Sequence, residues 1–120
     1  MEKFSAIDLF SGCGGLTSGL KQAGFRVVAA IEVDSKAAEA YKSNHRQVPI
    51  KQSDIRRVSA RGLMRGLNIG PGELDLLAGC PPCQGFSVLR TQNGAKPSHD
   101  IRNDLVYEML RFTRAFFPTQ

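Results

Sequence analysis

The sequence lacks the features that mark membrane, secreted and fibrous proteins. None of its apolar runs approaches the roughly 18–20 residues that a membrane-spanning helix requires. Asp8 interrupts the only stretch that resembles the apolar region of a signal peptide, and no small-residue cleavage site follows it. The chain also has no internal repeat and no low-complexity segment. We therefore expect a globular protein of the cytosol with no membrane partner.

Cysteine is also scarce. The chain has three cysteines, an odd number, and in the reducing cytosol these would be free thiols rather than disulfides. Its 120 residues suit a single domain, and a content of 42% hydrophobic and 22% charged residues is typical of globular proteins. The 16 Lys and Arg residues exceed the 11 Asp and Glu residues, so the net charge of +5 is compatible with an anionic partner.

Short apolar runs alternate with helix-like stretches, which is typical of an α/β domain with a parallel sheet. Gly24 is placed to end the first helix, and Asp34 or Ser35 to cap the second. We expect strands at residues 4–10, 25–31, 48–51 and 74–78, and helices at 16–23, 34–44, 55–67 and from about 100 to Pro118.

The last predicted helix follows an unusual segment. Residues 79–99 show no periodicity, and a loop of this length in a compact domain is typical of a lid or a binding loop. In the helix itself, Leu105, Met109, Phe112 and Phe116 recur at helical spacing. Packing of this stripe against the sheet is the simplest interpretation, well ahead of a cofactor box.

A glycine-rich turn follows the first predicted strand. Ser11-Gly12-Cys13-Gly14-Gly15 connects that strand to a helix, and Glu32 closes the second strand about twenty residues later. Glycines let the backbone approach a ligand closely, and an acidic residue at that place can accept hydrogen bonds from the hydroxyls of a ribose. The alternative is a turn that merely packs the helix on the strand.

The spacing of this turn narrows the class of ligand. It lacks the G-x-G-x-x-G pattern of dinucleotide sites, and the following helix lacks a Lys-Ser/Thr pair for gripping phosphate. A nucleoside without a phosphate chain, such as S-adenosylmethionine, suits it better. Asp54 and Ile55, after the third strand, would add a carboxylate for the adenine amino group and an apolar face for its ring.

A second motif, Gly79-Cys80-Pro81-Pro82-Cys83-Gln84-Gly85-Phe86-Ser87, directly follows the fourth predicted strand, at the end of the sheet where α/β proteins bind ligands. Cys80 and Cys83 form a C-x-x-C pair, which in other proteins indicates redox exchange or half of a zinc site. A zinc site needs two more ligands, and the remaining Cys and His residues have no paired spacing, so we expect no metal. The other interpretation makes one thiolate a nucleophile that the stiff prolines hold at the strand end.

Together, Asp8-Leu9-Phe10-Ser11-Gly12-Cys13-Gly14-Gly15 and Pro81-Pro82-Cys83-Gln84-Gly85-Phe86-Ser87 closely resemble motifs of the cytosine-C5 DNA methyltransferases. The resemblance runs in order through Glu32, Asp54-Ile55 and Asp100-x-Arg102-Asn103-x-Leu105, and so covers nearly the whole chain. It implies the Rossmann-like parallel sheet of S-adenosylmethionine-dependent methyltransferases, with a catalytic loop at about residues 79–100. It also implies double-stranded DNA as the partner and a bacterial or archaeal cytoplasm as the location.

The resemblance implies a role for each motif residue. Cys83 matches the family's nucleophile, Phe10 would stack on adenine, and Glu32 would bind the ribose. The implied cofactor-binding residues are Phe10, Ser11, Gly12, Cys13, Gly14, Gly15, Glu32, Val33, Asp54, Ile55, Pro82 and Leu105. The residues implied to contact DNA are Gln84, Ser87, Arg90 and Arg102.

The implied reaction explains why a cysteine is needed. Cytosine C5 is a poor nucleophile until a thiolate adds at C6, and a thiolate is both a good nucleophile and a good leaving group. The target base must leave the DNA stack to meet the thiolate, which requires a pocket and a long loop. Cys13 and Cys80 lie where the family tolerates other residues, and we predict that both are small buried groups.

The family's later motifs are absent from these 120 residues: a Glu-Asn-Val motif, an arginine-rich motif, the target-recognition region and a final helix. The resemblance therefore implies the N-terminal part of a catalytic domain, inactive alone, which needs a missing C-terminal part or a second polypeptide. The alternatives are a remnant that only binds cofactor or DNA and, less readily, a transfer-RNA cytosine methylase.

The spacing of the remaining basic residues gives two further predictions. Arg57, Arg61 and Arg65 would share one face of the helix predicted at residues 55–67, and a solvated face is a simpler interpretation than a DNA-binding patch. His45 and His99 are predicted to be surface residues, of which His99, in the long loop, is better placed to approach phosphate.

Overall fold

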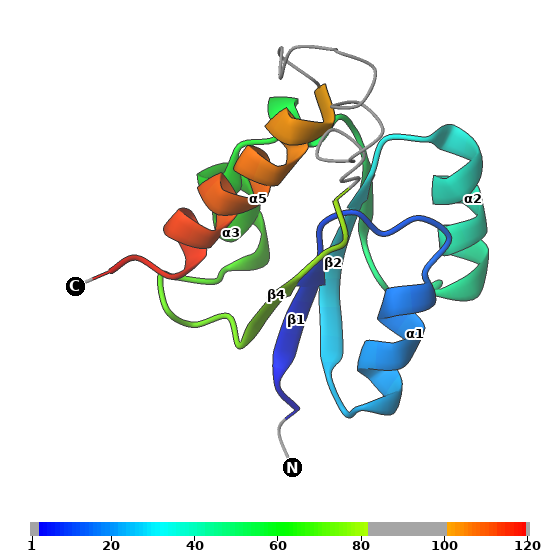
Figure 1. Ribbon diagram of the computed structural model, residues 1–120. Coiled ribbons are helices and arrows are strands. Elements are labelled where there is room, and N and C mark those ends of the chain that lie inside the picture. The colour runs from blue at the N-terminus through cyan, green and yellow to red at the C-terminus, as the bar shows by residue number, and fades with distance from the viewer. Residues whose placement is uncertain (1–2, 82–100, 120) are drawn as a thin grey trace, which may run out of the picture.

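The computed structural model describes residues 3–81 and 101–119, without the side chains of residues 101–103. Four parallel strands form one sheet in the order β3-β2-β1-β4 (Figure 1). Their bounds are β1 Ser5–Asp8, β2 Arg26–Glu32, β3 Ile50–Gln52 and β4 Leu76–Ala78. The chain runs outward from β1 through β2 to β3 and then returns to place β4 on the other side of β1. The sheet order therefore reverses between β1 and β4.

Helices cover both faces of this sheet. Figure 1 shows α1 and α2 on one side and α3 and α5 on the other. The helical bounds are α1 Gly15–Gln22, α2 Ser35–Asn44, the single 3₁₀ turn η1 Ile55–Arg57, α3 Ala60–Leu67 and α5 Ile101–Phe116. The α/β class with a parallel sheet, predicted from the alternation of apolar runs, is confirmed.

The core is divided by the sheet into two apolar clusters. Neighbouring residues of a strand point to opposite faces, so Ile7 joins the cluster under α3 and α5 while Ala6 joins the cluster under α1 and α2. Phe112 and Phe116 of α5 are fully buried in the first cluster, and Leu105 and Met109 pack against it. The interpretation of that stripe as core packing is confirmed.

Local signals at α1 and α2 match the structure. Gly24, with a positive φ of 96°, follows α1 and donates its N–H to the Lys21 carbonyl at 3.0 Å. At the start of α2, the Asp34 carboxylate accepts a hydrogen bond from the Ala37 N–H at 2.8 Å. The predicted helix end and the predicted cap are therefore confirmed.

The single helix predicted over residues 55–67 is wrong. Val58 takes an extended conformation after η1, and Ser59 then caps α3 by accepting the Gly62 N–H at 3.0 Å. Arg57 therefore lies on a different element from Arg61 and Arg65, and the predicted shared face of three arginines does not exist. The four strands are also shorter than, or shifted from, the predicted ranges, because their ends continue into turns.

Within residues 3–81 and 101–119, we find no helix that is both long and apolar enough to cross a membrane. The unperiodic loop predicted at 79–99 lies almost entirely outside the described residues.

Candidate functional site

A cavity of about 210 Å³ lies at the carboxyl ends of the strands, next to the point where the sheet order reverses. Open α/β sheets bind ligands at this position, because the loops that follow neighbouring strands diverge there. The lining comes from the residues after each strand and from the first turns of α5. It consists of Leu9, Phe10, Gly12, Ile31, Glu32, Val33, Ser53, Asp54, Ile55, Cys80 and Leu105.

Most of the cofactor residues inferred from the sequence meet in this cavity. Phe10, Gly12, Glu32, Val33, Asp54, Ile55 and Leu105 all line it, although they come from four separate parts of the chain. Ser11, Cys13, Gly14 and Gly15 belong to the adjoining turn and are not part of the lining. Pro82, Cys83, Gln84, Ser87, Arg90 and His99 lie outside the described residues, as does the side chain of Arg102.

The lining also includes residues that sequence reasoning missed. Leu9 and Ile31 are core residues whose edges reach the cavity, and Ser53 follows the end of β3. Their only sequence signal was adjacency to the inferred cofactor residues. Cys80, which the sequence analysis named in the second motif without a cofactor role, also lines the cavity. Cavities of about 590 and 900 Å³ lie elsewhere, but neither contains a residue inferred for chemistry.

Glu32 is held rigidly at the end of β2. Its Oε1 accepts the Gly12 N–H at 2.8 Å, and its Oε2 accepts the Asp34 N–H at 2.9 Å. A carboxylate oxygen can accept two hydrogen bonds, so each oxygen keeps one acceptor position after these contacts. The pair is therefore a preoriented double acceptor, which is the arrangement that two neighbouring ribose hydroxyls require.

Asp54 is fixed in an equally specific way. Arg56 donates through Nε to Oδ1 at 3.0 Å and through a terminal nitrogen to Oδ2 at 2.6 Å, and its backbone N–H also reaches Oδ1. These hydrogen bonds from Arg56 lower the pKa of the Asp54 carboxyl to about 2. Asp54 is therefore an ionised acceptor at neutral pH, at the rim of the cavity.

Apolar surface completes the cavity. Val33 is 63% exposed and lines the cavity, so its apolar side chain is accessible to a bound ring. Gly79, directly after β4, lies so close to the Phe10 ring that an added Cβ would be 3.1 Å from Phe10 Cδ2. The cavity thus combines acidic acceptors with aromatic and aliphatic walls.

The glycine-rich turn takes a backbone conformation that few other residues tolerate. Gly12 and Gly14 have φ values of 55° and 105°, and the Gly14 N–H closes the turn on the Ser11 carbonyl at 3.0 Å. A Cβ on Gly14 would lie 2.5 Å from His45 Cδ2 and 3.1 Å from Tyr41 Cδ2. Both the conformation and the packing therefore require glycine at position 14.

We expect Gly14→Ala to lower the free energy of unfolding by roughly 2–4 kcal/mol, through a positive φ and a clash with a packed ring. Gly15→Ala is the matched control. A Cβ there meets nothing within 4 Å, and the residue begins α1, so alanine should be neutral or stabilising by up to about 1 kcal/mol. Denaturant unfolding of both variants tests the difference, and equal stabilities would contradict it.

His45 is buried, which corrects the prediction of a surface residue. It is only 6% exposed, and its Nε2 lies 2.9 Å from the Gly14 carbonyl oxygen. The cause is the end of α2, which packs against the glycine-rich turn and encloses the imidazole. No sequence spacing pointed to this contact.

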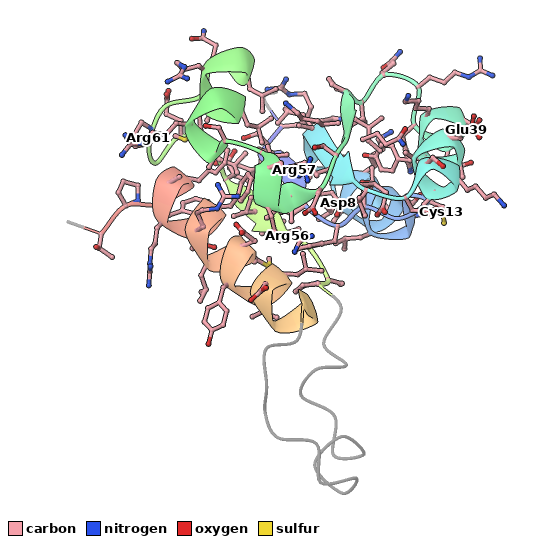
Figure 2. The ribbon with its side chains drawn as sticks, turned by 90° about the horizontal axis from the view of Figure 1, so that it is seen from above. Asp8, Cys13, Glu39, Arg56, Arg57 and Arg61 are labelled. Carbon is pink, nitrogen blue, oxygen red and sulfur yellow. The ribbon has the colours of Figure 1, made fainter. Side chains whose placement is uncertain are left out.

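Cys13 and Cys80 are exposed, which corrects the prediction that both are buried. Cys13 lies at the tip of a turn, and Figure 2 shows it at the outer edge of the molecule beside α2, while Asp8 lies near the centre. Cys80 lies two residues after the end of β4 and lines the cavity. In the part of the chain that the structure describes, no group of three or more His, Cys, Asp or Glu residues could hold a metal ion.

Comparison with known proteins gives a consistent result. The family model described as C-5 cytosine-specific DNA methylase matches residues 4–120. The chain is 37% identical over 112 residues to type II methyltransferase M.AgeI of Thalassovita gelatinovora, covering 93% of this chain and 25% of that protein. It is 36% identical over 118 residues to type II methyltransferase M.AquIA of a Picosynechococcus strain, covering 98% of this chain and 46% of that protein.

Solved structures show the same fold. A protein described as a DNA modification methyltransferase, encoded within an E. coli prophage, superposes with a TM-score of 0.76 at 32% identity, covering 94% of this chain and 29% of its own. The Dnmt2 methyltransferase of S. pombe superposes with a TM-score of 0.63 at 20% identity, which shows a shared fold alone. The chain spans about a quarter to a half of the length of these relatives.

Proposed function

Because the chain belongs to the C-5 cytosine-specific DNA methylase family, we propose that it forms the N-terminal part of the catalytic domain of a DNA cytosine-C5 methyltransferase, carrying the cofactor site and the nucleophile. One observation carries this proposal. Cofactor residues inferred from four separate parts of the sequence converge on one cavity at the strand ends.

The cavity suits S-adenosylmethionine. This cofactor supplies a methyl group on a sulfonium, which makes the carbon electrophilic. The Glu32 carboxylate offers two open acceptor positions to the ribose hydroxyls, and the ionised Asp54 offers an acceptor to the adenine amino group. Phe10, Val33 and Ile55 provide the apolar walls that would hold the adenine ring. Among the described residues that line the cavity, none is a Lys, Arg or His.

Cys83 is the proposed nucleophile, on the strength of the motif that contains it. Its thiolate would add to C6 of a flipped-out cytosine, forming a carbon–sulfur bond and making C5 nucleophilic. After C5 is methylated, removal of the C5 proton returns an electron pair to the ring and expels the thiolate. Cys80, three residues earlier in the sequence, follows β4 and lines the cavity, which supports a nucleophile close to the cofactor site.

Catalysis by this chain requires further parts. The relatives are two to four times longer than the region that they share with this chain, and the rest of their sequence has no counterpart in these 120 residues. We propose that the rest of the catalytic domain, in the same or a second polypeptide, supplies the Glu-Asn-Val motif, whose glutamate would contact the cytosine, and the target-recognition region. Double-stranded DNA is the proposed substrate, and the net positive charge suits it.

The proposal is tested by methyl transfer in the complete enzyme. Purified protein is incubated with radiolabelled S-adenosylmethionine and either duplex DNA or transfer RNA, and the labelled nucleoside is identified after digestion. We expect label in 5-methyldeoxycytidine from DNA. Label in RNA alone would favour the transfer-RNA alternative, and cofactor binding without any transfer would favour the non-catalytic one.

The exposed Cys80 gives a direct probe of the cofactor site. Because its side chain lines the cavity, S-adenosylmethionine at ten times its Kd should slow alkylation of Cys80 by about 10-fold. Cys13, exposed outside the cavity, is the internal control and should be slowed far less. Peptide mapping by mass spectrometry reads both sites at once, and alkylation of Cys80 that the cofactor does not slow would place the cofactor elsewhere.

A further inference from the structure

Two residues at the end of α2 form hydrogen bonds with two consecutive backbone carbonyl groups of the glycine-rich turn. Asn44 donates through Nδ2 to the Cys13 carbonyl oxygen at 3.0 Å, and His45 Nε2 lies 2.9 Å from the Gly14 carbonyl oxygen. Neither side chain lines the cavity. Their contacts reach the cofactor site only through the backbone of the turn.

The hydrogen-bond partners of His45 assign its tautomer. Lys21 Nζ lies 2.9 Å from His45 Nδ1, and an ammonium group can only donate, so Nδ1 accepts. The ring proton is then on Nε2, which donates to the Gly14 carbonyl. His45 therefore acts as a neutral donor fixed at both nitrogens.

The ring that makes this contact has little room to move. Tyr41 lies beside it with ring centroids 5.0 Å apart, and Tyr41 is itself fully buried. Its hydroxyl is 2.9 Å from Thr17 Oγ1, which donates to the Asp8 carboxylate at 2.8 Å. Burial raises the pKa of Tyr41 to about 12, so the phenol keeps its proton and can donate to Thr17. This chain of contacts ties α2 to the end of β1 beneath the turn.

The opposite end of the turn is held by the cofactor site itself. The Gly12 N–H donates to Glu32 Oε1, the carboxylate proposed to bind the ribose. The turn is thus fixed between Glu32 on one side and the end of α2 on the other. A change at either anchor alters the backbone that faces the cofactor.

We propose that Asn44 and His45 are positioning residues for S-adenosylmethionine, which hold the glycine-rich turn in its binding conformation without touching the ligand. This inference rests on the proposed function, and it adds two residues that no sequence motif indicated. Both anchors hold the backbone of the turn by direct hydrogen bonds, and a turn held in one conformation loses little conformational freedom on binding.

The test is the Kd for S-adenosylmethionine, measured by calorimetry on the complete enzyme well below its unfolding temperature. Asn44→Ala and His45→Met each remove one hydrogen bond to the turn and should raise the Kd roughly 2- to 10-fold. His45→Gln restores an N–H donor near the position of Nε2 and should recover affinity relative to His45→Met. Ser43→Ala, an exposed residue in the same helical turn, is the control and should leave the Kd unchanged.

The variants separate positioning from stability. Asn44 is exposed, so Asn44→Ala should fold with a nearly unchanged unfolding temperature while its Kd rises. Wild-type affinity in folded Asn44→Ala, or equal affinities of His45→Met and His45→Gln, would overturn the inference. Absence of cofactor binding in the wild type would instead refute the proposed function. Loss of binding in Glu32→Ala, with normal binding in the Asn44 and His45 variants, would refute only the inference.

Discussion

Cys83→Ser is expected to reduce methyl transfer by the complete enzyme at least roughly 10³-fold, with little change in cofactor affinity. A serine hydroxyl is far less acidic than a thiol, so almost none of it is ionised at neutral pH, and the alkoxide is a poorer leaving group from C6. Single-turnover transfer of labelled methyl groups to DNA measures the chemical step directly.

Cys80→Ser is the matched control for this loss. It makes the same exchange of sulfur for oxygen three residues earlier, at a residue that lines the cavity, and should leave transfer within a few-fold of wild type. If the C-x-x-C pair instead held zinc, the metal would be recovered stoichiometrically with the protein and lost in Cys80→Ser. Retention of full activity in Cys83→Ser would exclude a nucleophilic role for Cys83.

Glu32→Ala is expected to weaken S-adenosylmethionine binding by about 1.5–3 kcal/mol, which is roughly a 10- to 150-fold rise in Kd. Two effects contribute. The ribose loses a charged double acceptor, and the Gly12 N–H loses the partner that fixes the turn beside the cofactor. Asp34 loses a contact as well, but it retains its own cap on α2.

Glu32→Gln separates these two effects. Its amide oxygen can still accept the Gly12 N–H, so the turn should remain anchored while the second acceptor and the charge are lost. We expect an affinity between those of the wild type and Glu32→Ala. Calorimetry that gives wild-type affinity for Glu32→Ala would remove Glu32 from the site.

The position of the site could be predicted because it depends on strand ends. Glu32 ends the apolar run of the second strand and Asp54 comes shortly after the third strand, and parallel strands bring such positions to one edge of the sheet. The sequence therefore indicated which residues would converge without any knowledge of their distances. The same reasoning placed Cys80 near the site by its position after β4, although its exposure was predicted wrongly.

The support beneath the site could not be predicted. Asn44 and His45 reach the turn because α2 packs across it, and this depends on the angle between two helices rather than on any spacing in the sequence. A lone histidine after an alanine-rich helix resembles a surface residue. The close approach of the His45 ring to Gly14 appears only in the structure, and it explains why position 14 has no room for a side chain.

The break between η1 and α3 shows a different limit. Hydrophobic periodicity continues across Val58 and Ser59, so it predicts one helix. Val58 is extended instead, and the Ser59 side chain accepts a hydrogen bond from the Gly62 N–H, so that a separate helix begins at Ala60. A cap of this kind contributes about 1 kcal/mol, and the break separates Arg57 from Arg61 and Arg65.

The most direct test of the central claim is covalent trapping on DNA that carries 5-fluorocytosine at the methylation site. Fluorine at C5 cannot leave as the proton does, so the adduct between enzyme and base persists after methylation. The complete wild-type enzyme with S-adenosylmethionine should give a denaturation-resistant protein–DNA band, with the modified peptide containing Cys83. Cys83→Ser should give no band. A band that survives in Cys83→Ser but disappears in Cys80→Ser would contradict the account and exchange the roles of the two cysteines.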